Sequence, residues 1–149
     1  MPGCGGRRGP DPAAALPAFP ADARAARGFN GDIGQSLQRW REQLESGTVA
    51  ADLLGTRIAR KTLLAVAGLV SVHDRTWTTS RQRAAQRWSE VDTGLSAHLG
   101  LLLSWAERER HPAPGDIQLA LASDGIVAAI VRRFATLIGL WEDEGPESP

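Results

Sequence analysis

The apolar positions between residues 31 and 141 recur with helical periods. In DIGQSLQRWREQLESG, Ile33, Leu37, Trp40 and Leu44 are spaced four, three and four residues apart, which puts them on one stripe of a helix. Gly47 follows this stripe and is suited to a left-handed helix stop. The pattern therefore predicts an amphipathic helix that ends at Gly47.

The segment after it is apolar on nearly every side. We expect a short piece from Val49 to Leu54 that ends at Gly55, and a long helix that is capped by Thr56 and runs to about Ser71. Its valines would also permit a strand, but TRIARKTLL continues in helical period without turn residues. In a globular chain, a helix that is apolar all round is typical of a central, buried element.

Three further apolar stripes follow along the chain. Ser80 or Thr79 is expected to cap the first of them, and Asp116 is expected to cap the last. No segment alternates as a half-buried strand does, so we predict an all-α fold, a bundle of about five helices. The inward positions of the three stripes are Ala84, Ala85, Trp88 and Val91; then Leu95, Leu99, Leu102, Leu103 and Ala106; then Ile126, Ile130, Phe134, Leu137 and Trp141.

The two ends of the chain lack this pattern. Residues 1–28 contain five of the nine prolines and almost no bulky apolar side chains, so we expect a disordered Pro/Gly/Ala-rich leader. The last residues, EDEGPESP, are acidic and are expected to be loose. The predicted domains are therefore the leader at 1–28, a helical bundle at 29–142 and a flexible acidic tail at 143–149.

Composition limits the classes of function. The 149 residues carry no net charge, and Cys4, the single cysteine, excludes an internal disulfide and a cysteine-based zinc site. The apolar runs are shorter than the ~20 residues that span a bilayer, or are interrupted by charges such as Asp124 and Arg132. We expect a cytoplasmic protein with no membrane partner.

Between Arg57 and Arg87 the sequence has six arginines and one lysine against a single acid. The spacing of Arg57, Arg60 and Lys61 predicts that they share one helix face, and Arg81 lies in the first turn of the next helix. This basic band is either a solvated polar face or a phosphate-binding surface. It lacks aromatic residues at base-stacking spacing, which argues against a nucleic-acid partner.

The junction SVHDRTWTTS offers few groups for catalysis. Trp77 is either a plug that folds back on the bundle or a surface on which a ligand stacks. His73 and Asp74 are neighbours in sequence, which favours turn chemistry over an acid–base pair. His98 and His111 have no second ligand at helical spacing, and the phosphate-loop, dinucleotide and nucleophile-elbow motifs are absent. We therefore predict no catalytic residue and no metal site.

Three elements of the sequence occur in a recognisable order. R-x-x-R-K-T-x-L covers Arg57–Leu64, GLVSVHD follows, and TWTT-x-R covers Thr76–Arg81. Together they resemble the region after the catalytic domain in bacterial, especially actinobacterial, nucleotidyltransferases. Those enzymes belong to the DNA polymerase β-like superfamily, which includes the aminoglycoside nucleotidyltransferases. The resemblance covers residues 31–141.

The resemblance implies a helical domain that lies beside a nucleotidyltransfer site and helps to hold the acceptor substrate. In those enzymes the chemistry belongs to a Gly-Ser turn followed by Asp-x-Asp, which binds Mg²⁺ and a nucleoside triphosphate. This sequence has no such arrangement, because acid pairs such as Glu90 and Asp92 follow no Gly-Ser turn. The substrate-binding residues that the resemblance implies are Arg57, Arg60, Lys61, His73, Asp74, Trp77 and Arg81.

We therefore expect a truncated, nucleotidyltransferase-like chain that is inactive alone. It would hold no cofactor itself, and Mg²⁺ and a nucleoside triphosphate would come with the missing catalytic domain, its expected partner. The alternative is a non-enzymatic helical interaction module or a homo-oligomer that associates through exposed apolar surface.

Overall fold

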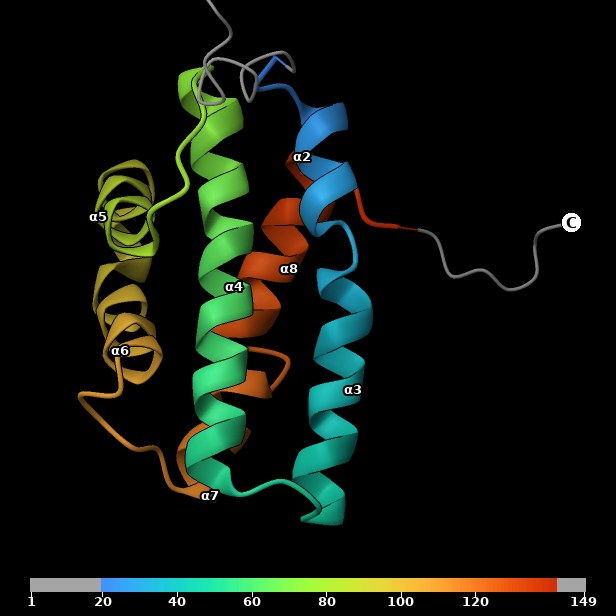
Figure 1. Ribbon diagram of the computed structural model, residues 1–149, viewed down its shortest axis with the longest axis vertical. Helices are drawn as coiled ribbons and strands as arrows, with labels where there is room; N and C mark the ends of the chain where they lie inside the picture. Colours follow the sequence, from blue (N-terminus) through green and yellow to red (C-terminus); the bar gives the residue numbers. More distant parts are fainter. Residues whose placement is uncertain (1–19, 142–149) are drawn as a thin grey trace, which may run out of the picture.

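The computed structural model describes residues 20–141, so the predicted acidic tail and the leader as far as residue 19 lie outside the described part (Figure 1). Within residues 20–141 every regular element is a helix, which confirms the all-α prediction. Five helices have eleven residues or more, and two have eight. The longer ones are α3 (Ile33–Ser46), α4 (Ala51–Asp74), α5 (Arg81–Val91), α6 (Ser96–Ala106) and α8 (Ile126–Leu137); the shorter are α2 (Ala23–Asn30) and α7 (Pro114–Leu121), and a 3₁₀ turn, η2, covers Thr93–Leu95.

Helix α4 is the centre of the bundle. In Figure 1, α5 and α6 lie on one side of it, α2 and α3 lie on the other side, and α8 passes behind it. Its buried residues continue around the helix, including Leu54, Ile58, Leu63, Val66 and Leu69. The prediction of a central, buried helix is confirmed, because neighbouring helices cover most sides of α4 and leave one exposed stripe through Leu53, Arg57, Arg60 and Leu64.

The start of α4 differs from the prediction. The helix begins at Ala51 and passes through Gly55 without a break, and the Thr56 hydroxyl donates to the Asp52 carbonyl instead of capping a new helix. A Cβ atom at position 55 would collide with the ring of Pro112. Gly55 is therefore a point of close packing and not a stop. Gly47, with a φ of 69°, ends α3 as predicted.

The start of α5 agrees with the prediction. The Ser80 hydroxyl accepts a hydrogen bond from the backbone N–H of Arg83 at 3.2 Å, which is the expected N-cap. Ala84, Ala85 and Trp88 are buried, as their spacing predicted. Val91 was expected to face inward but is 37% exposed, because it is the last residue of α5.

The apolar run near the C-terminus forms two helices where one was predicted. The Asp116 side chain accepts from the backbone N–H of Ala113 at 2.9 Å and so stabilises the start of α7, not of the last helix. Gly125 then packs directly on carbonyl groups of α7, and α8 starts at Ile126. By length and composition alone, Pro114–Leu137 could cross a membrane, but buried core helices pass the same test.

Helix α2 extends the helical part beyond the predicted boundary at residue 28. The Asp22 carboxylate caps its first turn by accepting a backbone hydrogen bond at 2.9 Å. Trp141, predicted to lie on the last core stripe, is 45% exposed and packs instead on the end of α2. Its indole N–H donates to the Arg27 carbonyl and its backbone N–H donates to the Gly31 carbonyl, both at 2.8 Å. Residues 23–28, expected to be disordered, are thus part of the bundle.

Candidate functional site

The seven site residues implied by the sequence fall into two groups at opposite ends of α4. Arg57 and His73 are sixteen positions apart on the same helix, which corresponds to roughly 24 Å along its axis. The structure therefore does not bring the seven together. The first group consists of Arg57, Arg60 and Lys61, and the second consists of His73, Asp74, Trp77 and Arg81.

The first group shares one face of α4, as its spacing predicted, but two of its side chains turn to different neighbours. The Arg60 Nε atom donates to the Ala106 carbonyl of α6 at 3.0 Å. The Lys61 ammonium pairs with the Asp32 carboxylate, between α2 and α3, at 2.7 Å. Adjacent helix positions differ by about 100°, so from this one face the two side chains reach neighbours on either side of it. Arg57 and Arg60 are both exposed, and Arg57 is the one of the three without such a tie within residues 20–141.

Asp74 and Arg87 join the end of α4 to α5. Arg87 donates to both carboxylate oxygens of Asp74 at 3.0 Å, and His73 Nδ1 lies 2.9 Å from Asp74 Oδ1. Arg87 also pairs with Glu90 at 3.0 Å. The hydrogen bond from Arg87, followed by that from His73, lowers the pKa of Asp74 from 3.8 to about 2. Asp74 is therefore a structural anion that fastens two helices.

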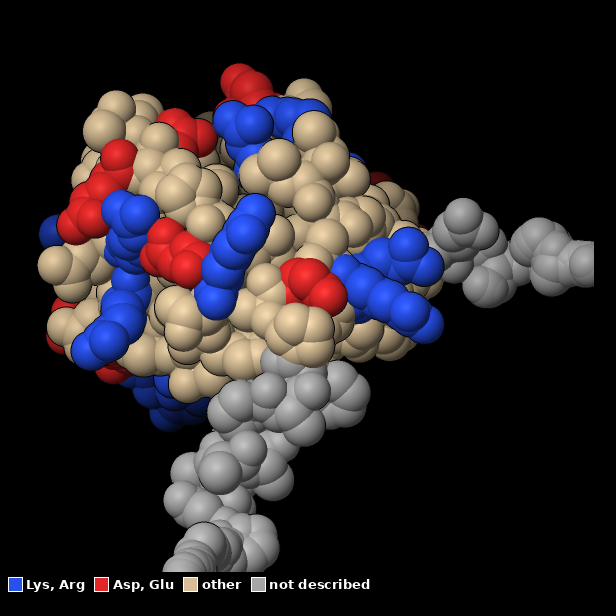
Figure 2. Space-filling model, turned by 90° about the horizontal axis from the view of Figure 1, so that it is seen from above, with Lys and Arg blue, Asp and Glu red and all other residues tan. Residues whose placement is uncertain are grey.

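The charges at this end of the molecule are mixed. Figure 2 views this end of the molecule, and basic and acidic side chains alternate across it with uncharged surface between them. Along the predicted basic band as a whole, Arg87 at this end and Arg60 and Lys61 farther down α4 are each paired with a partner within the bundle. Phosphate binding needs a concentration of positive charge, and the face shown in Figure 2 mixes positive and negative side chains.

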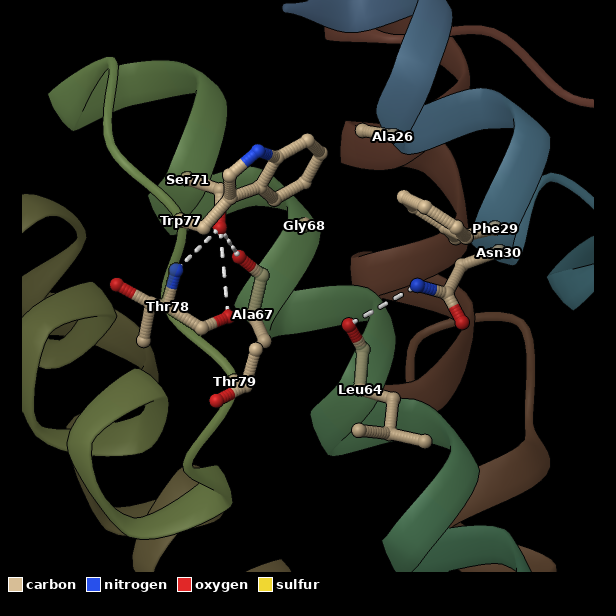
Figure 3. A pocket seen from close by; sticks show the side chains of 10 residues that line it. All are labelled: Ala26, Phe29, Asn30, Leu64, Ala67, Gly68, Ser71, Trp77, Thr78 and Thr79. Carbon is tan, nitrogen blue, oxygen red and sulfur yellow. Dashed lines mark hydrogen bonds between the residues drawn. The ribbon is translucent and has the colours of Figure 1, made fainter. Parts of the chain in front are cut away.

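A pocket of about 270 Å³ lies between α2, α4 and the segment that connects α4 to α5 (Figure 3). Its floor is a row on α4 formed by Leu64, Ala67, Gly68 and Ser71, which recur at helical spacing. Three of these four side chains are small, so α4 is recessed here and leaves space above it. Behind the floor, Gly68 faces the ring of Phe134, which closes the pocket toward the core.

Two aromatic side chains form the walls of the pocket. Phe29 comes from α2 and Trp77 from the connecting segment, and their ring centroids are 5.6 Å apart with the planes inclined at 74°. Phe29 is 61% exposed, while Trp77 is half-buried. Edge-to-face pairing is a preferred geometry for aromatic rings, so the two walls support each other.

Backbone ties hold Trp77 in place over α4. The Ser71 hydroxyl donates to the Ala67 carbonyl at 2.7 Å and accepts from the Thr78 backbone N–H at 2.9 Å. The Thr76 backbone N–H donates to the Ser71 carbonyl at 3.1 Å, after Arg75 reverses the chain with a φ of 58°. The segment between α4 and α5 is therefore pinned on both sides of Trp77.

The chemistry of this pocket is apolar. None of the ten residues that line it carries a charge, and its amide, from Asn30, donates to the Leu64 carbonyl at 3.4 Å. Mg²⁺ with a triphosphate needs hard oxygen ligands, so this lining does not fit it. Within residues 20–141 no three His, Cys, Asp or Glu side chains are grouped as metal ligands. The pocket is suited to binding an apolar group.

Of the seven predicted substrate-binding residues, only Trp77 lines the pocket. The small positions of α4 carried a signal, because Leu64, Ala67, Gly68 and Ser71 recur at helical spacing within an otherwise bulky apolar run. No sequence signal identified Phe29 as a pocket residue, because it stands next to the predicted end of the leader and is separated from Trp77 by a whole helical hairpin. No protein-family model, no curated protein and no solved structure matches this chain, so its own residues and geometry carry the functional inference.

Proposed function

We propose that this chain is the helical, substrate-side domain of a nucleotidyltransferase-like protein and is inactive without a catalytic domain. The supporting observation is that all three elements of the resemblance contribute to one pocket. Leu64 comes from the R-x-x-R-K-T-x-L element, Gly68 and Ser71 come from GLVSVHD, and Trp77 comes from TWTT-x-R. In this proposal the recess is where the domain would hold a part of the acceptor substrate.

In this proposal the helical domain binds the acceptor substrate, and the partner domain catalyses the nucleotidyl transfer. The Gly-Ser turn and Asp-x-Asp of the partner would hold Mg²⁺ and the nucleoside triphosphate, for which the pocket has no ligands. Trp77 is the acceptor contact that we retain from the sequence, and exposed Arg57 and half-buried Arg81 remain open to the same role. Arg60, Lys61 and Asp74 tie α4 to its neighbours, and His73 pairs with Asp74 of the same helix, so these four are assigned no substrate contact.

The test is to express the chain with and without the coding sequence that precedes it. We expect Mg²⁺-ATP to bind only to the extended protein, with a heat signal in isothermal titration calorimetry. Asp→Ala substitutions in the upstream Asp-x-Asp should abolish that signal and leave the helical domain folded. The proposal fails if residues 1–149 alone bind Mg²⁺-ATP as tightly, or if the preceding sequence encodes no Gly-Ser and Asp-x-Asp elements.

A second candidate function is a non-enzymatic interaction module or a homo-oligomer. It is favoured by large apolar side chains that stay exposed within the described residues, of which Leu119 at 72% and Phe29 at 61% are the most exposed. Such side chains mark interaction surfaces when they form a patch. Sedimentation velocity from low to high micromolar concentration tests self-association, and a monomer at every concentration would exclude the homo-oligomer.

A further inference from the structure

We propose that the Phe29–Trp77 pocket binds a neutral small molecule with a planar group of two fused rings. This assignment does not depend on the nucleotidyltransferase-like role, because it follows from the size, walls and charge of the pocket. It adds a class of ligand to a site that the sequence had marked only through Trp77.

Size sets the number of rings. The pocket measures about 270 Å³. A cavity of roughly 150 Å³ lined by apolar side chains accommodates one benzene ring. The larger pocket therefore has room for a second ring fused to the first, but not for an extended polycyclic molecule.

The walls favour a flat guest. Phe29 and Trp77 contact each other edge to face, with centroids 5.6 Å apart, so a guest does not fit between them and lies beside the pair, over the floor where Gly68 and Ala67 leave α4 recessed. A flat aromatic group can lie on this floor and meet the paired rings at their edge, which is a preferred geometry between rings. Figure 3 shows these two rings on either side of the α4 floor.

Charge and hydrogen bonding exclude most polar ligands. No lining residue is ionisable, so a charged guest would lose its hydration without gaining a counter-charge. The Ser71 hydroxyl and the Thr78 N–H already pair with each other. The Asn30 amide is held only by a 3.4 Å contact to Leu64, close to the limit for a hydrogen bond, so it can turn to one polar atom of a guest.

The occupant is a small molecule and not a peptide. A peptide segment brings backbone donors and acceptors that need partners once they are covered. The lining cannot pair a whole backbone, because the Ser71 hydroxyl and the Thr78 N–H are consumed by their own tie and the other side-chain polar groups are the hydroxyls of Thr78 and Thr79 and the Asn30 amide. A free two-ring molecule with a single hydrogen-bonding group makes no such demand.

The experiment is a titration of the full chain with indole, followed by two-dimensional ¹H–¹⁵N NMR. Indole has two fused rings, no charge and one N–H. We expect saturable shifts at the amides of Phe29, Asn30, Gly68 and Thr79, with a Kd on the order of 1 mM or tighter. Indole-3-carboxylate, the same ring system with a negative charge, should bind about tenfold more weakly or not at all.

Two variants with similar starting exposure locate the site. Leu64 and Leu53 both lie on α4 and are 37% and 40% exposed, but only Leu64 lines the pocket. We expect Leu64→Gln to weaken indole binding about fivefold or more and Leu53→Gln to leave it unchanged. Phe29→Ala, at an exposed position, should weaken binding without affecting the fold, which far-ultraviolet circular dichroism checks.

Three outcomes would overturn the proposal. The first is no saturable shift up to the solubility of indole, and the second is saturable shifts away from the pocket or equal effects of Leu64→Gln and Leu53→Gln. The third is tighter binding of N-acetyltryptophanamide than of indole, which would identify the occupant as a tryptophan side chain of a partner protein. None of these results bears on Mg²⁺-ATP binding by the extended protein, so the two proposals fail separately.

Discussion

Arg87 holds the carboxylate of Asp74 with two of its nitrogen atoms, each 3.0 Å from an oxygen, and so joins the last turn of α4 to α5. One turn earlier, the Ser71 hydroxyl receives the N–H of Thr78. The segment between the two helices is therefore fastened to α4 by side chains on both sides of Trp77. This double attachment fixes one wall of the pocket.

Asp74 makes the free energy of unfolding depend on pH between about 4 and 2. Hydrogen bonds from Arg87 and His73 lower its folded-state pKa from 3.8 to about 2, so in this range the unfolded chain binds more protons. The stabilising contribution is complete above about pH 4 and is lost as pH falls through about 2. We expect the stability difference between wild type and Asp74→Asn to shrink over this range in urea unfolding. A difference that stays constant from about pH 5 to about pH 2 would contradict the assignment.

Ser71→Ala should destabilise the protein more than Ser89→Ala. Both hydroxyls donate to a carbonyl four residues earlier at 2.7 Å, but only Ser71 also accepts an N–H from another segment. Removing it leaves the half-buried Thr78 N–H unpaired, which costs about 1–3 kcal/mol, with the low end expected at this exposure. Urea unfolding gives the two free energies, and hydrogen exchange should accelerate at Thr78. Equal losses in the two variants would show that the Thr78 tie contributes nothing.

Gly55→Ala and Gly100→Ala should change stability in opposite directions. Both glycines lie inside helices, where alanine is preferred by about 0.5–1 kcal/mol. A Cβ at position 100 meets open space, whereas one at position 55 collides with the buried ring of Pro112, which has no flexible end to move aside. Overpacking costs about 1–3 kcal/mol, which outweighs the gain in propensity. Thermal unfolding of the two variants measures the contrast, and stabilisation by both would refute the close contact.

Trp141→Phe should loosen α2 while keeping an aromatic ring at its end. The substitution removes the indole N–H that donates to the Arg27 carbonyl at 2.8 Å. Since Trp141 is 45% exposed, water replaces part of that bond, and the expected loss is about 0.5–1 kcal/mol. Hydrogen exchange should increase at the amides of α2 and stay unchanged in α5. Unchanged protection in α2 would mean that Trp141 merely rests on the surface.

Helical periodicity was enough to predict the fold class and most of the core. Trp40, Trp88, Ile130 and Phe134 were placed inside by spacing alone, and the structure buries all four. The helix caps at Ser80 and Gly47 were also predicted correctly, because a cap depends on a few neighbouring residues. The glycines were ambiguous in the sequence, because their roles depend on packing. Gly55 within α4 packs against the distant Pro112, and Gly125 before α8 packs against the preceding helix.

The sequence by itself determined that residues 20–141 form a bundle of helices around α4, because burying an apolar stripe is decided by periodicity within one segment. Only the tertiary structure decided which residues form the pocket and which partners the charged side chains reach. Phe29 and Trp77 are 48 positions apart in the sequence but have ring centroids 5.6 Å apart, and Lys61 and Arg60 turn to helices on either side of α4. These relationships depend on which helix covers which side of α4, and local spacing carries no information about that choice.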